Sequence, residues 1–218
     1  MAGTLEPEYR GARRRLVEVL QDKGIKDLAV LRAIDTVPRH LFVPESVRHR
    51  AYEDAALPIG AGQTISQPWV HARAIELLQL TGRERVLEIG TGSAYQTALL
   101  AQLCEQVFSV ERFAQLLDKA RQLLQQANVR NVSVSLGDGT LGWREYSPYD
   151  AIVVSAAAPH VPPSLESQLA EGGRLLIPIG DREEQMLVLY TKRSGTLDRR
   201  DITPVRFVPL IGAEGWPA

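Results

Sequence analysis

The stretch VLEIGTGSAYQTALL, Val86–Leu100, decides the fold, because an apolar segment passes through two glycines into a pattern typical of a helix. We expect a strand over 85–89 and a helix over 94–103. Gly90 and Gly92 let the backbone approach a ligand with no Cβ in the way. Ligands of open parallel sheets lie at the carboxyl ends of the strands. The stretch therefore predicts a binding site at this strand end.

The spacing of the glycines favours a cationic ligand over a dinucleotide. A dinucleotide loop has the form G-x-G-x-x-G, and counting from Gly90 places Tyr95 at the third glycine. The pattern thus disfavours a nicotinamide oxidoreductase. Glu88 brings a negative charge that repels a pyrophosphate and suits a cation. S-adenosylmethionine carries a sulfonium and an ammonium and has no phosphate, and its carboxylate can use the amide donors of a helix start.

Two more acidic residues follow at the ends of the next two predicted strands. Glu111 comes at the end of the first, where a carboxylate can accept both hydroxyls of a ribose. Asp138 follows the second, where it can accept from an adenine amino group. Taken singly, Glu111 also fits a helix start and Asp138 a turn. Together with Glu88 they favour a positively charged nucleoside.

Strands and helices alternate along most of the chain. The expected strands cover 85–89, 106–110, 131–136, 149–154 and 173–179, and the expected helices cover 94–103, 113–126 and 165–170. Such alternation predicts a mostly parallel sheet with helices on both faces. Two β-rich segments, 185–191 and 201–208, are separated by a short link at 193–196 and must be antiparallel. The predicted fold class is therefore α/β and Rossmann-like, with an antiparallel C-terminal hairpin.

The N-terminal part is expected to be helical, with helices over 6–21 and 26–35. We assign 1–56 to an N-terminal helical extension and 57–218 to the domain with the glycine loop, and expect the two to form one structural unit. The segment LPIGAGQTISQP, Leu57–Pro68, is too long and polar for a simple turn, and such loops are often functional. A helix beginning at Pro68 is expected after it.

Charge and composition disfavour several classes of partner. The 218 residues include 25 basic and 26 acidic side chains, a net charge of −1, which argues against nucleic acid. We interpret the run Arg13–Arg15 as the solvated side of a helix, with a phosphate-binding arm as the alternative. Cys104 is the only cysteine, so no intrachain disulfide can form. The histidines have no metal-ligand spacing, and we expect no metal.

The distribution of apolar residues predicts a cytoplasmic protein. No apolar stretch approaches the roughly 18 residues of a membrane helix, and the first residues do not resemble a secretory signal. We therefore expect no membrane partner. In the absence of heptads or a long exposed apolar stripe, a monomer is the default expectation.

Seven motifs, spread over most of the chain, are similar to those of one family in the same order. They are LPIGAGQTISQP, VLEIGTGSAYQTA, SVER, GDG, YDAIVVSAA, GGRLLIPIG and RFVPL. The chain resembles the protein-L-isoaspartate (D-aspartate) O-methyltransferases, particularly the bacterial type. The resemblance implies a class I methyltransferase fold with a seven-stranded sheet over 57–218, and S-adenosyl-L-methionine as cofactor. It further implies repair of damaged proteins and peptides by methylation of the free α-carboxyl of L-isoaspartyl residues, with D-aspartyl residues as further candidates.

The resemblance assigns roles residue by residue. Ser66 matches the active-site serine, and Gln63, Thr64 and Ile65 stand beside it in the expected substrate-binding loop. His71 falls where animal members carry a cofactor-contacting histidine. The expected cofactor-binding positions, including two loop neighbours, are Glu88, Gly90, Thr91, Gly92, Ser93, Glu111, Arg112, Asp138 and Gly139. Ala94 departs from the family, in which glycine is usual there, and this bears on the fit of the methionine end.

The chemistry expected of this reaction needs no general base, because a carboxylate with a pKa of about 4 is already an anion at neutral pH. Ser66 is expected to donate a hydrogen bond to that carboxylate, and its alternative role is the N-cap of the helix at Pro68. A methyltransferase of the same fold with another acceptor stays open as an alternative. So does a non-catalytic protein that binds the cofactor.

Overall fold

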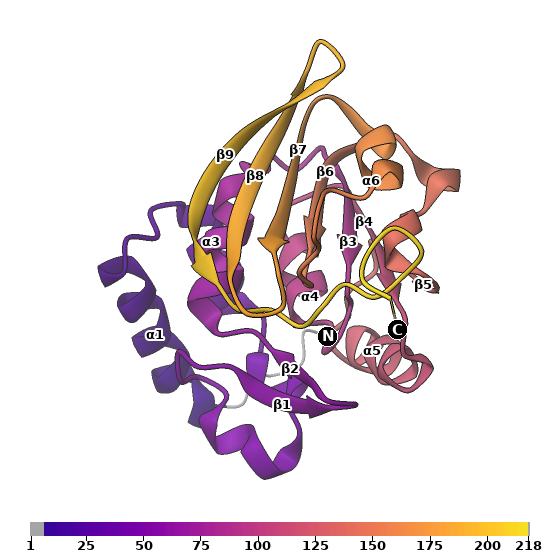
Figure 1. Cartoon of the computed structure of the whole chain (residues 1–218). Coiled ribbons are helices and arrows are strands. Elements are labelled where there is room, and N and C mark those ends of the chain that lie inside the picture. Colours follow the sequence, from indigo (N-terminus) through magenta and orange to yellow (C-terminus); the bar gives the residue numbers. More distant parts are fainter. Residues whose placement is uncertain (1–6, 218) are drawn as a thin grey trace.

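Seven strands form one sheet in the order β5-β4-β3-β6-β7-β8-β9 in the computed structural model, which describes residues 7–217 (Figure 1). Their bounds are β3 (Arg85–Ile89), β4 (Gln106–Glu111), β5 (Val132–Leu136), β6 (Tyr149–Val154), β7 (Leu169–Gly180), β8 (Gln185–Arg193) and β9 (Thr196–Val205). The first five strands in this order pair in parallel. β8 and β9 pair antiparallel to their neighbours. The predicted mixed sheet with an antiparallel C-terminal hairpin is confirmed.

The order of the strands places a topological switch beside β3. The chain runs outward from β3 through β4 to β5 and then returns to the other side of β3 as β6. Helices therefore cross on opposite sides of this point and leave a crevice at the carboxyl ends of the strands, which is the usual ligand position in such folds. Val86, Leu87 and Ile89 are buried, as expected of a strand covered on both faces.

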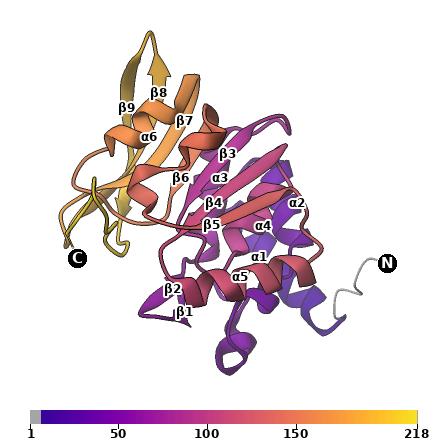
Figure 2. The same cartoon turned by 90° about the vertical axis from the view of Figure 1, so that its right-hand side faces the viewer.

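Helices cover the two faces of the sheet unequally (Figure 2). The helices are α1 (Pro7–Asp22), α2 (Leu28–Thr36), α3 (Pro68–Leu78), α4 (Tyr95–Ala101), α5 (Ala114–Gln126) and α6 (Pro163–Gln168), and four short 3-10 helices are η1 (Arg39–Phe42), η2 (Glu45–Arg50), η3 (Gly139–Leu141) and η4 (Arg144–Tyr146). Buried side chains of α1 to α5 share one apolar core with one face of the sheet. Leu165 of α6 packs in the core on the other face.

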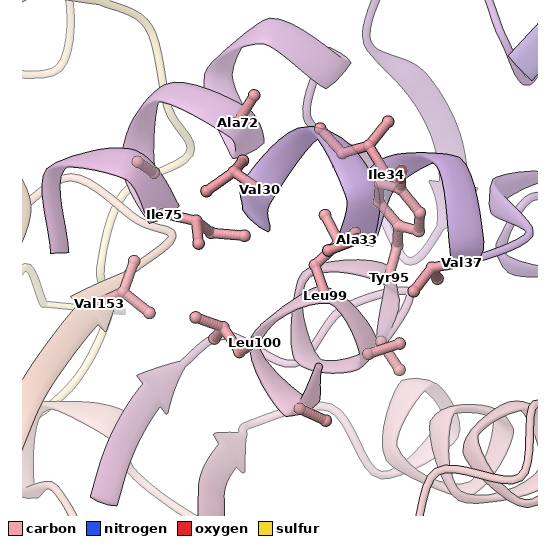
Figure 3. Close-up of a cluster of buried hydrophobic side chains, with 14 of the residues drawn as sticks. Val30, Ala33, Ile34, Val37, Ala72, Ile75, Tyr95, Leu99, Leu100 and Val153 are labelled. Atoms are coloured by element: carbon pink, nitrogen blue, oxygen red, sulfur yellow. The ribbon is translucent and has the colours of Figure 1, made fainter. Parts of the chain in front are cut away.

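Apolar side chains from three helices meet above the sheet (Figure 3). Ile34 of α2, Ile75 of α3 and Leu99 of α4 belong to this group and are almost fully buried, as is Val153 of β6. The expected N-terminal extension thus packs in the same core as the glycine-loop domain. The boundary at 56/57 stays a prediction, and residues 1–6 and 218 of the two predicted units lie outside the described residues.

Several predicted boundaries differ from the structure. The helix expected over 165–170 is α6, which ends at Gln168, and β7 begins at Leu169. The last strand begins at Thr196 rather than Asp201, because Ser194 and Gly195 both have positive φ, 51° and 76°, and form a tight turn directly after β8. The same strand ends at Val205 rather than Val208. After this end, the backbone of Phe207 hydrogen bonds with the side chain of Gln185.

The N-terminal basic run contains one buried residue, so its interpretation as a solvated face was wrong for Arg13. Arg13 is 3% exposed, and its Nε lies 3.6 Å from a carboxylate oxygen of Asp35. Arg14 and Arg15 are exposed as expected. The difference arises because Arg13 lies on the same side of α1 as the buried Leu16 and Leu20. Between Pro7 and Pro217, no helix is both long and apolar enough to cross a membrane.

Candidate active site

A cavity of about 980 Å³ opens at the carboxyl ends of the strands. One wall is a two-stranded hairpin, β1 (Leu57–Gly60) and β2 (Gln63–Ile65), together with the start of α3. A second wall is the turn after β3 and the end of β4, and a third is the segment 204–211, which begins in the last two residues of β9. The predicted cofactor loop and the predicted substrate loop thus line the same cavity.

The glycine loop has a backbone that requires unusual conformations at three positions. Gly90 and Gly92 have φ of 93° and 52°, and Ala94, the N-cap of α4, has φ of 66°. The left-handed region disfavours residues with a Cβ, so the first two positions suit glycine. Ala94 is fully buried and adopts the same region despite its methyl group. The strand–turn–helix geometry predicted for this stretch is confirmed.

Glu111 is positioned at the edge of the cavity by backbone donors. Its two carboxylate oxygens accept hydrogen bonds from the N–H of Gly92 at 2.8 Å and of Phe113 at 2.9 Å. Each oxygen keeps a further lone pair, and the residue lines the cavity. The carboxylate is therefore oriented to accept hydroxyl groups of a ligand beside the glycine loop.

Glu88 lies beneath the loop and is absent from the described residues that line the cavity. One of its carboxylate oxygens accepts from the hydroxyls of Thr97 at 2.5 Å and Ser109 at 2.7 Å, and the other accepts from the Gln96 amide at 3.0 Å. Burial raises the pKa of Glu88 to about 7 although these hydrogen bonds favour the charged form. The expected direct contact with a cation stays a prediction. In the structure Glu88 is connected to the cavity by its hydrogen bond with Gln96, which lines it.

His71 lines the cavity from α3 and is buried. Its Nδ1 lies 3.0 Å from the Gln96 amide oxygen. Burial lowers the pKa of His71 to about 3, and the nearby guanidinium of Arg39 adds to this, against the hydrogen-bonding oxygens of Gln96 and the Ser66 backbone. The ring is therefore neutral at physiological pH.

Ser66 lies in the cavity wall, between β2 and α3. Its backbone carbonyl accepts a hydrogen bond of 2.8 Å from the fully buried guanidinium of Arg39, which also donates to the Ala51 carbonyl at 2.9 Å. The alternative role of Ser66 as N-cap is wrong, because the N-cap of α3 is Gln67, without a side-chain capping bond. Ser66 is thus held by its backbone and lines the cavity with the glycine loop.

The other predicted loop residues are also placed at the cavity. Gln63, Thr64 and Ile65 line it beside Ser66, and Thr91, Ser93 and Arg112 line it on the side of the glycine loop. The hydroxyl of Thr91 lies 2.6 Å from that of Ser109, which links the loop to the Glu88 site. No wall of the cavity gathers a metal site, since no group of three potential ligands occurs among the residues the structure describes.

Comparisons with known proteins agree with this geometry. A sequence model of the protein-L-isoaspartate(D-aspartate) O-methyltransferase family matches residues 11–215. The chain belongs to this family. The protein-L-isoaspartate O-methyltransferase of Dictyoglomus thermophilum is 51% identical over 210 residues, 96% of each chain. That of Pseudomonas paraeruginosa is 53% identical over 200 residues, 91% of this chain and 95% of the relative.

Two solved structures of the same family are similar throughout the fold. One protein-L-isoaspartate O-methyltransferase superposes with a TM-score of 0.86 at 31% identity, covering 93% of this chain and 67% of the other. Another, from Plasmodium falciparum in complex with S-adenosyl-L-homocysteine, has a TM-score of 0.79 at 28% identity, covering 91% and 98%. The protein-L-isoaspartate O-methyltransferase family is S-adenosyl-L-methionine-dependent, and this chain is a methyltransferase of that family with the class I fold.

Asp138 is at the end of β5, as predicted, but its carboxylate is engaged by the C-terminal segment. One oxygen accepts from the backbone N–H and hydroxyl of Thr140, and the other from the N–H of Ala213 at 2.7 Å. Burial opposes ionisation of Asp138, yet the donors from Ala213 and Thr140 outweigh it and lower its pKa. Gly139 lines the cavity and Asp138 stands behind it. Its expected contact with adenine stays a prediction.

Sequence reasoning missed four contributors to the protein-L-isoaspartate O-methyltransferase site. Gln96 and Ser155 connect the Glu88 site to the cavity, and the segment 204–211 forms a whole wall of it. The motif RFVPL in this segment was a sign of family membership, but nothing in its residue types indicates a ligand. Arg39 was also missed, because a buried arginine that binds backbone carbonyls has no local sequence signature.

Proposed function

We propose that this protein transfers the methyl group of S-adenosyl-L-methionine to the free α-carboxyl of L-isoaspartyl residues in damaged proteins and peptides. The methoxy group of the resulting ester leaves more readily than an oxygen of the free carboxylate. A backbone nitrogen then attacks the ester carbonyl, methanol leaves, and the succinimide that forms can be hydrolysed to normal aspartate. The observation that carries the proposal is the presence of Ser66 and the glycine loop in one cavity of a chain with this family's match over 11–215.

The residues around the cavity fit S-adenosyl-L-methionine. Glu111 offers two oriented oxygens to the ribose hydroxyls, and the start of α4 offers backbone donors to the methionine carboxylate. His71 lines the same cavity, and within the described part of the chain its buried Nε2 has no hydrogen-bond partner. When bound, the cofactor supplies a methyl group on a positively charged sulfur. We assign its binding to the loop residues predicted above, with Glu88 and Asp138 acting from behind the wall.

Ser66 orients the substrate in this proposal. Its hydroxyl donates a hydrogen bond to one oxygen of the isoaspartyl carboxylate, which needs no base because it is already ionised. Arg39 fixes the carbonyl of Ser66 and so limits the movement of the loop. Alignment of reacting groups can contribute several kcal/mol to a rate. Gln63, Thr64 and Ile65 shape the same wall for an extended peptide.

The experiment compares an isoaspartyl peptide with its normal aspartyl twin, using labelled S-adenosyl-L-methionine. We expect methyl incorporation only into the isoaspartyl peptide, as an ester that is labile in mild base. Equal labelling of the two peptides would favour another acceptor. Binding of cofactor without labelling of either peptide would favour the non-catalytic alternative.

The variant Ser66→Ala tests the proposed role of the hydroxyl. Loss of a hydrogen bond to a charged group should lower kcat/KM roughly 10- to 100-fold, with little change in melting temperature. Ser167→Ala, at an exposed serine of α6, is the matched control and should keep full activity. A Ser66→Ala enzyme with wild-type turnover would remove Ser66 from the mechanism.

Four further expectations stay predictions. They are the cytoplasmic location, the monomeric state, activity on D-aspartyl residues and the absence of a nucleic-acid partner.

A further inference from the structure

Gln96 connects two buried ionisable residues at the base of the cavity. Its Nε2 lies 3.0 Å from an oxygen of Glu88 and 3.0 Å from the hydroxyl of Ser155, and its Oε1 lies 3.0 Å from Nδ1 of His71. Gln96 stands in the first turn of α4, directly behind the glycine loop. The three side chains come from β3, α4 and α3, so Gln96 joins the cofactor side of the cavity to the helix that follows the Ser66 loop.

The hydroxyl donors around Glu88 fix the direction of these hydrogen bonds. Thr97 and Ser109 both donate to Glu88, as expected around a carboxylate, which only accepts when ionised. The Gln96 amide group that faces Glu88 must then be its NH₂, and its carbonyl oxygen faces His71. An oxygen can only accept, so Nδ1 of His71 carries the hydrogen.

A neutral imidazole with its hydrogen on Nδ1 has an unprotonated Nε2. The backbone carbonyl of Ser66 is a second acceptor near the ring and also accepts from Arg39 at 2.8 Å, but among the described residues it forms no hydrogen bond with Nε2. Nε2 is buried and, within residues 7–217, makes no hydrogen bond, while His71 lines the cavity. A buried lone pair without a donor among these residues therefore belongs to a side chain that lines the cavity.

We propose that Gln96 is a positioning residue that holds His71 in the Nδ1–H tautomer, so that Nε2 accepts a hydrogen bond from an N–H donor of the bound cofactor. The donor is the ammonium of the methionine part, since His71 and Gln96 flank the glycine-loop end of the cavity. The identity of this donor rests on the proposed function, whereas the tautomer does not. A neutral ring also avoids placing a second positive charge beside the sulfonium.

The tautomer is measured by nitrogen-15 NMR of the ligand-free protein with labelled histidine. At pH 7.5 we expect the His71 spectrum to show a protonated Nδ1 and an unprotonated Nε2. A charged ring, or a hydrogen on Nε2, would overturn the proposal, because Gln96 would then be turned the other way. This test needs no ligand and no variant, so it stands even if the proposed function fails.

The donor is tested by calorimetry with S-adenosyl-L-homocysteine and its analogue without the amino group. The wild-type protein should prefer the amino compound roughly tenfold or more, as expected for a hydrogen bond from a charged group. This preference should shrink in Gln96→Leu and His71→Asn and persist in Gln102→Leu, an exposed glutamine at the end of the same helix. A preference unchanged in both site variants would overturn the proposal. If the wild-type protein binds neither compound, the proposed function itself is wrong.

Discussion

Individual residues of the site have a strained backbone conformation or a buried charge that the sequence alone does not predict. Ala94 illustrates this, since the residue type only signals a departure from the family's glycine, whereas its φ of 66° appears in the structure. Arg39 is a second example, because burial lowers the pKa of its guanidinium to about 10, against the favourable effect of nearby tyrosines and Asp54. Both residues adjoin the cavity walls that carry the predicted site.

Replacing Ala94 by glycine should change stability only slightly. Relief of the left-handed conformation gains about 1 kcal/mol. The lost buried methyl costs about 0.8 kcal/mol, and the freer unfolded chain costs about 0.4–1 kcal/mol. Denaturant unfolding should thus show a net change below about 1 kcal/mol. Gly90→Ala, at φ 93°, should instead cost about 1–3 kcal/mol, and equal effects of the two variants would contradict this account of the loop.

Arg39→Lys should impair catalysis through the Ser66 loop. A lysine has one donor group and cannot bridge the carbonyls of Ala51 and Ser66 in the same fork geometry. We expect kcat to fall roughly tenfold, as for the loss of one such hydrogen bond, with KM for S-adenosyl-L-methionine nearly unchanged. Steady-state kinetics with an isoaspartyl peptide measures this. An effect confined to the cofactor KM would show that Arg39 does not act through Ser66.

At the scale of elements, long periodic segments were predictable and short irregular ones were not. β3, α4, β4 and α5 follow the predicted order within a few residues, because each has a continuous apolar pattern. The segment Leu57–Pro68 was expected to be a loop, but the structure forms the hairpin of β1 and β2 there. Strands of three and four residues with a register shift between Pro58 and Gly60 leave no recognisable period in the sequence.

Glu88 of β3 accepts hydrogen bonds from Ser109 of β4 and Thr97 of α4, and its buried carboxyl predicts a pH dependence of stability. The pKa of Glu88 is about 7 in the fold and about 4.5 when exposed, so the native state holds more protons between these values. Stability therefore falls as pH rises from about 4.5 to about 7, by about 3 kcal/mol for this group. His71, with its pKa lowered to about 3 from 6.5, has the opposite effect below pH 6.5.

Comparison with Glu88→Gln isolates the contribution of the carboxyl, since His71 is present in both proteins. The stability of the wild type relative to the variant should decline between about pH 4.5 and pH 7 and then level off. Urea unfolding at a series of pH values measures this difference. A difference that is constant over the range would show that Glu88 titrates normally in the fold.

For the whole molecule, the sequence predicted the mixed sheet and the position of the site at the strand ends. The pattern of strands and helices fixes which ends meet, and so Glu111, the glycines and the Ser66 loop were expected near one another. The pattern does not show which side chains face the cavity. Glu88 and Asp138 lie behind its wall with other partners, and the wall at 204–211 depends on how the chain returns after β9.

Because three separate segments enclose the cavity, a ligand there should stabilise the entire fold. S-adenosyl-L-homocysteine at a hundred times its Kd should add about 2.7 kcal/mol to the free energy of unfolding. For a domain of this size the melting temperature should rise by about 5–10 °C. Differential scanning calorimetry with and without the ligand measures the shift, and adenosine diphosphate is the control that should give none. An unchanged melting temperature at saturating ligand would argue against this cavity as the binding site.

The most direct test is a crystal structure of this protein with S-adenosyl-L-homocysteine. The ligand should lie in the cavity between the glycine loop and the segment 204–211, with its ribose hydroxyls hydrogen-bonded to Glu111 and its sulfur facing Ser66. A ligand bound elsewhere, or one whose sulfur is walled off from Ser66, would contradict the claim that one cavity brings the methyl donor to the isoaspartyl carboxylate.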